Sequence, residues 1–141
     1  MTFEVIEYKK DIYAYVIRND EKVDTTKFYS PKDCDMQFGI VSHDKGYVEP
    51  AHKHKLVKRE IYNTIETLHV TSGITQINFY EEELEKLILI REVVLNKGDT
   101  ILLLGDKIHQ LVSNHKFSGI KTKQGPYISL DEDKILYDTN K

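Results

Sequence analysis

Short runs in which apolar and polar residues alternate follow one another along most of the chain. This period of two is typical of half-buried β-strands, and the runs are rich in β-branched and aromatic residues. The pattern predicts strands at Phe3–Tyr8, Ile12–Ile17, Met36–Ser42, the segment around His52–His54, Glu66–Thr71, Ile74–Tyr80, Leu87–Leu95, Thr100–Leu104, Lys107–Val112 and Gly119–Thr122. So many short strands predict an all-β barrel or sandwich.

Two local signals refine this pattern. The pair Ser72–Gly73 lies between two apolar runs, and glycine supplies the positive φ of a tight turn, so we expect a β-hairpin there. Helix is favoured by composition only at Glu81–Arg91. Its dense aliphatic residues instead favour a strand after an acidic turn at Glu81–Glu83.

Length, composition and charge narrow the class of protein. A chain of 141 residues that is 40% hydrophobic fits one domain over residues 1–141, with a barrel core at about residues 36–127. Basic and acidic residues are interspersed and the net charge is −3, which argues against nucleic acid or an anionic membrane as partner. The single cysteine, Cys34, agrees with a reducing compartment, and no apolar run is long enough to span a bilayer. We expect a soluble cytoplasmic protein.

Two of the histidines stand two residues apart, at His52 and His54. On a strand such residues point to the same side, so both imidazoles can bind one ion while Lys53 points away. The spacing therefore predicts half of a metal site.

Glu66 and His109 are the natural further ligands. Glu66 shares a strand face with Leu68 and Val70, and a carboxylate among inward-facing aliphatic residues needs a metal ion or a cationic partner. His109 follows an apolar strand across a short turn. Glu60 is nearer to the histidine pair in sequence, but only Glu66 keeps the fixed distance to the expected hairpin glycine, Gly73.

These residues resemble the two sequence motifs of the cupin family. Gly46, the histidine pair, Glu66 and Gly73 are similar to the first motif, and Gly98–Asp99 with His109 is similar to the second. The resemblance implies a cupin double-stranded β-helix, a jelly-roll barrel with extra N-terminal strands. It also implies one divalent transition metal held by His52, His54, Glu66 and His109. Imidazole and carboxylate ligands leave Fe, Mn, Ni, Co, Cu and Zn open, and the alternative is a hydrogen-bonded polar cluster without metal.

Other residues are candidates for substrate contacts. Arg59 offers a bidentate fork for phosphate or carboxylate, and an inward Gln37 offers an amide. Tyr62 and Lys123 are candidate catalytic proton carriers, and Tyr127 is a further candidate for substrate binding. An ordinary surface or structural role is the alternative for each of these residues, and for exposed basic residues it is the commoner case.

A metal ion held by three histidines and one carboxylate has coordination positions open for substrate or water. The segment from Met36 to Tyr127 also resembles small stand-alone cupins of bacterial surface-carbohydrate biosynthesis. That likeness implies an isomerase or epimerase acting on a sugar or sugar nucleotide. Two alternatives stay open, an iron-dependent dioxygenase and a non-catalytic module that binds a small molecule.

The N-terminal strands bear on assembly. Phe3–Tyr8 and Ile12–Ile17 are apolar enough to be an aggregation hazard unless the barrel or a second subunit covers them. We therefore expect a homodimer.

Overall fold

The structure is a computed structural model that describes residues 2–139. The elements in chain order are β1 (Phe3–Tyr8), β2 (Asp11–Ile17), β3 (Lys27–Phe28), β4 (Gly39–Ile40), β5 (Glu66–Glu83), β6 (Lys86–Asn96), β7 (Thr100–Leu103), β8 (Ile108–Val112), β9 (Phe117–Lys123) and the single-turn helix α1 (Leu130–Asp133). The predicted all-β class is confirmed. The chain divides into two compact units, residues 1–21 with 64–141 and residues 22–63.

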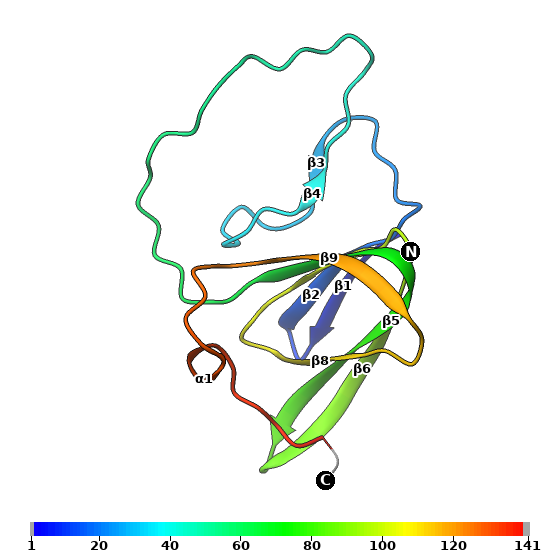
Figure 1. The fold of residues 1–141 in the computed structure, drawn as a ribbon, viewed down its shortest axis with the longest axis vertical. Helices are drawn as coiled ribbons and strands as arrows, with labels where there is room; N and C mark the ends of the chain where they lie inside the picture. Colours follow the sequence, from blue (N-terminus) through cyan, green and yellow to red (C-terminus); the bar gives the residue numbers. More distant parts are fainter. Residues whose placement is uncertain (1, 140–141) are drawn as a thin grey trace. The chain divides into compact units, whose positions relative to one another are not determined.

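A seven-stranded antiparallel sheet makes up the first unit. One half holds β1, β2, β7, the start of β5 and β9, and the other holds β6, the end of β5 and β8. The long β5 runs through both halves (Figure 1). Within residues 2–139, β1 and β6 each pair with one neighbour, so the sheet has open edges and does not close on itself.

The predicted hairpin at Ser72–Gly73 is wrong, because the chain continues through it as one strand. Gly73 has a φ of +76°, and the pairing of β5 with β9 shifts register between Val70 and Ser72. A β-bulge of this kind bends a strand without reversing it. Thr67 and His69 before the bend pair with β7 and β9, whereas the residues after it pair with β6 and β8.

The core lies between the two halves of the sheet. The alternation of β5 places Glu66, Leu68 and Val70 inside and leaves His69 exposed, as the sequence predicts. Side chains from both halves, such as Ile101 and Phe79, are fully buried in one cluster. The inward face of β5 thus continues from the hydrophobic core to a single carboxylate.

The second unit, residues 22–63, contains only the short pair β3 and β4. Phe38 is buried within it, and its backbone amide donates to the Ser30 hydroxyl. The strand predicted at Met36–Ser42 is reduced to Gly39–Ile40. The strand predicted around His52–His54 is absent, and residues 43–60 are exposed throughout. Alternation alone does not make a strand where no neighbouring strand supplies hydrogen bonds.

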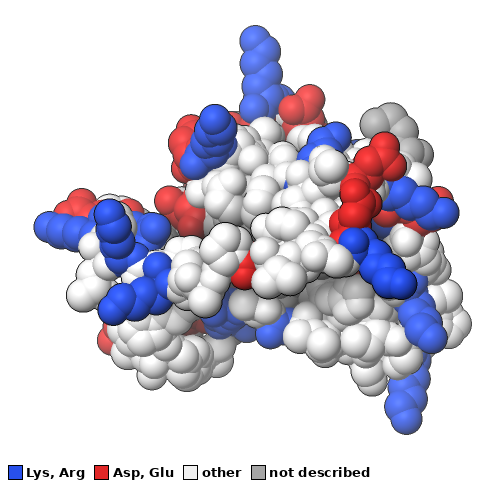
Figure 2. Space-filling view, turned by 90° about the horizontal axis from the view of Figure 1, so that it is seen from above, with Lys and Arg blue, Asp and Glu red and all other residues white. Residues whose placement is uncertain are grey.

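The surface agrees with the mixed charge of the sequence. On the face shown in Figure 2, lysine, arginine and acidic side chains are interspersed, with no wide area of one sign. No helix within residues 2–139 is long and apolar enough to cross a membrane.

Candidate functional site

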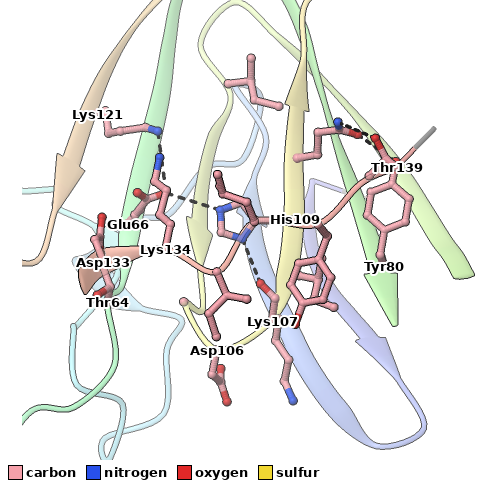
Figure 3. Close-up of a pocket in the computed structure, with 17 residues that line it drawn as sticks. Thr64, Glu66, Tyr80, Asp106, Lys107, His109, Lys121, Asp133, Lys134 and Thr139 are labelled. Carbon is pink, nitrogen blue, oxygen red and sulfur yellow. Dashed lines mark hydrogen bonds and ion pairs between the residues drawn. The ribbon is translucent and has the colours of Figure 1, made fainter. Parts of the chain in front are cut away.

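A pocket of about 510 Å³ opens in the first unit, and its walls come from β5, β8, β9 and the C-terminal segment. Its size falls in the range usual for small-molecule sites. Polar and charged side chains gather on one side, where Glu66 and His109 turn toward each other (Figure 3). The residues that line it are Thr64, Glu66, Tyr80, Gly105, Asp106, Lys107, Ile108, His109, Gln110, Leu111, Lys121, Asp133, Lys134, Ile135, Leu136, Tyr137 and Thr139.

Glu66 begins β5 and carries the inward carboxylate. Its side chain is only 9% exposed, and Oε2 lies 3.6 Å from Nε2 of His109 and 3.8 Å from Nζ of Lys121. The facing His109 ring is the largest influence that lowers the pKa of Glu66; burial opposes it, and the charge of Lys121 adds to the lowering. The carboxylate is therefore ionised at neutral pH although it is buried.

The His109 ring is oriented by the backbone just before it. Nδ1 lies 3.1 Å from the carbonyl oxygen of Lys107. A carbonyl only accepts, so Nδ1 carries the proton and donates it. Nε2 then faces Glu66 with either a second proton or a free lone pair. Metal-binding histidines commonly have this arrangement, in which one ring nitrogen donates to a carbonyl and the other is left for the ion.

Lys123, a predicted catalytic residue, lies next to the pocket and is engaged in an ion pair. Its Nζ binds the Asp133 carboxylate, and this contact raises the pKa of Lys123. Lys123 therefore stays protonated at neutral pH. The same ammonium lies 5.4 Å from the ring centroid of Tyr127, which is 67% exposed.

The other predicted site residues belong to the second unit. His52 and His54 have ring centroids 5.3 Å apart, and Nδ1 of His52 lies 2.9 Å from the carbonyl oxygen of Pro50, which leaves its Nε2 free. Gln37 donates to the carbonyl oxygens of Pro31 and Cys34. Arg59 and Tyr62 are exposed, and Glu60, the rejected ligand, lies 3.6 Å from Lys58.

The structure thus brings two of the predicted metal ligands, Glu66 and His109, into one pocket. The complete set spans both units and stays a prediction. Among residues 2–139, no group of three or more histidine, cysteine, aspartate or glutamate side chains is arranged to hold a metal ion. The Glu66 and His109 pair nevertheless fits a divalent ion chemically, since it joins an anionic oxygen to an oriented imidazole.

Lys121 is a pocket residue that the sequence did not reveal. Lys121 precedes Lys123 by two positions on β9, and their partners across the strands are Leu68 and Glu66, so both lysines share the inward face. The sequence shows that Lys121 and Lys123 lie on the same face of a strand. It does not show that this strand pairs with β5 at Glu66. On the other side of the pocket, Tyr80 donates to Oε1 of Gln110, 2.9 Å away.

Comparisons of the chain with protein family profiles, with curated proteins and with solved structures found no match.

Proposed function

We propose that this protein is a metal-dependent, cupin-type enzyme that isomerises or epimerises a sugar or sugar-nucleotide intermediate. The observation that carries the proposal is the buried Glu66 carboxylate facing the oriented Nε2 of His109 at the wall of a small-molecule pocket. Burying an ionised carboxylate is costly without cationic partners; Lys121 supplies one at 3.8 Å, and Nε2 of His109 beside the same carboxylate offers a divalent ion a second ligand. The sugar class rests on the resemblance in the sequence.

In this proposal Glu66 and His109 are two ligands of one divalent transition metal; the sequence predicts His52 and His54 as the other two. Carboxylate oxygens and imidazole nitrogens bind such ions at about 2.0–2.2 Å. Two donor atoms 3.6 Å apart are compatible with one ion between them. The hydrogen bonds that fix Nδ1 of His109 and of His52 leave Nε2 of each ring available.

A bound divalent ion would stabilise the negative charge that forms on a sugar carbonyl oxygen when a neighbouring carbon loses its proton. The protein must remove and return that proton, and Tyr80 is a titratable group of the same pocket. Lys121 balances the charge of Glu66. These side chains and the ligands form a site suited to proton transfer within one substrate.

The first test is metal binding. Purified protein without a histidine tag is stripped with chelator and titrated with Co²⁺, whose visible spectrum reports nitrogen and oxygen ligands. We expect one ion per chain, and at least tenfold weaker binding in Glu66→Gln, His109→Ala and His52→Ala. His115→Ala is the matched control because His115 is exposed and outside the pocket. Unchanged binding in both Glu66→Gln and His109→Ala would refute this centre.

The second test is catalysis. Metal-loaded protein is incubated in D₂O with a panel of nucleotide-linked keto sugars, and deuterium incorporation is followed by mass spectrometry. We expect exchange at the carbon next to the carbonyl, lost in Glu66→Gln. Metal binding without exchange across the panel would contradict the isomerase and favour a non-catalytic binding role.

A further inference from the structure

The C-terminal strap, residues 129–139, crosses between the two edge strands that flank the pocket. Asp133 at one end of the strap binds Lys123 of β9. Thr139 at the other end accepts a hydrogen bond of 3.2 Å from Nε2 of Gln110 on β8. Since β8 and β9 belong to different halves of the sheet, the strap joins their edges.

Local hydrogen bonds define the start of the strap. The Ser129 hydroxyl accepts from the amide of Glu132, and the amide of Lys134 donates to the carbonyl oxygen of Leu130. This single turn places Asp133 against Lys123 and Lys134 in the wall of the pocket. In Figure 3 the Lys134 side chain extends toward the region of Glu66 and Lys121.

Two ammonium groups therefore reach the polar side of the pocket from different elements. Lys121 comes from β9 and is half exposed, with Glu66 as its neighbour. Lys134 comes from the strap, and among residues 2–139 no carboxylate lies within ion-pair distance of its ammonium group. Of these two ammonium groups, that of Lys121 has an ion-pair partner and that of Lys134 has none among the described residues.

We propose that Lys121 and Lys134 form a subsite for the phosphate groups of the ligand, and that the strap carries Lys134 into it. The inference deepens the proposed function, since it names the ligand as a phosphorylated small molecule. Two ammonium groups match a diphosphate better than a single carboxylate, because each contributes its own charge-assisted hydrogen bond. The apolar strap residues Ile135 and Leu136, together with Tyr137, line the same pocket and suit the less polar part of such a ligand.

The subsite is tested by calorimetry on the full chain in chelator and low salt, so that no metal takes part. The probes are inorganic diphosphate, a uridine diphosphate sugar and the same sugar without phosphate. We expect the first two to bind and the free sugar to be silent. Lys121→Met and Lys134→Met should each weaken diphosphate binding about tenfold. Lys86→Met, at the exposed start of β6, is the matched control and should change nothing.

The role of the strap is tested by removing its anchor. Lys123→Met combined with Asp133→Asn breaks the ion pair without changing the net charge. In that background we expect Lys134→Met to have no further effect, whereas Lys121→Met still weakens binding about tenfold. If Lys134→Met and Lys121→Met both weaken binding in that background as much as in the wild type, the strap does not position Lys134. The subsite itself would then still stand.

Other outcomes separate this proposal from the metal centre. Equal loss of diphosphate binding in Lys86→Met, or no loss in Lys121→Met and Lys134→Met, would overturn the subsite. The diphosphate titration is made without metal. A protein that fails to bind Co²⁺ in the separate titration therefore does not affect its interpretation. Conversely, a protein that binds Co²⁺ through Glu66 but ignores diphosphate would refute the subsite and leave the metal centre intact.

Discussion

Replacing Gly73 by alanine should destabilise the protein much more than the same change at Gly46. Both glycines have a positive φ, +76° and +90°, where an alanine costs about 1–2 kcal/mol. At Gly73 a Cβ would also lie 2.2 Å from the carbonyl oxygen of Lys116 and 3.0 Å from Cα of Phe117. Those are backbone atoms at the start of the neighbouring strand β9, and relieving such overpacking costs a further ~1–3 kcal/mol.

The expected loss at Gly73 is therefore about 2–5 kcal/mol. At Gly46 a Cβ would meet no atom within 4 Å. The loss there should therefore not exceed the backbone cost of about 1–2 kcal/mol. Urea unfolding followed by far-UV circular dichroism measures both values. Equal losses, or a loss at Gly73 below that at Gly46, would refute the view that β5 bends against a fixed backbone at Gly73.

Three further measurements test other parts of the structure. Because the pKa of Glu66 is lowered by folding, its stabilising effect is present above the pKa of the unfolded chain and is lost as pH falls through the lowered value. The stability of the wild type should therefore fall more than that of Glu66→Gln between pH 6 and pH 3, and parallel curves would contradict the ion pair. Phe79→Ala removes a fully buried ring and should cost about 3–5 kcal/mol in urea unfolding, whereas a cost below 1 kcal/mol would contradict the core. Light scattering should give the mass of a homodimer, and a monomer at micromolar concentration would exclude it.

The strands with clear alternation were predictable from the sequence. β1 has the bounds expected, β7 is one residue shorter, and β6 is one residue longer at each end. The inward face of Glu66, Leu68 and Val70 follows from a period of two. These features are local, since each depends on residues close together in the chain. The same locality made the buried carboxylate of Glu66 detectable without a structure.

The remaining features depend on pairing between distant segments. A glycine with positive φ fits a hairpin and a β-bulge equally well, so Ser72–Gly73 did not reveal that β5 continues. The spacing of His52 and His54 puts both side chains on one side only if the segment is a strand, and the structure has no strand there. The sequence did not place Lys121 in a pocket, because a lysine is normally a surface residue. Only the pairing of Lys121 with Leu68 shows which face of β9 it occupies.

The central position of β5 has a consequence for folding. Its first half lies between β7 and β9 and its second half between β6 and β8, so both edges are hydrogen-bonded over most of its length. Amide protons of β5 should therefore be among the last to exchange with solvent, since their exposure requires opening both halves of the sheet. The partners β7 and β9 are distant in sequence, and such non-local pairing is slow to form. A ligand that holds β8 and β9 together at the pocket would slow that opening and make the whole strand exchange more slowly.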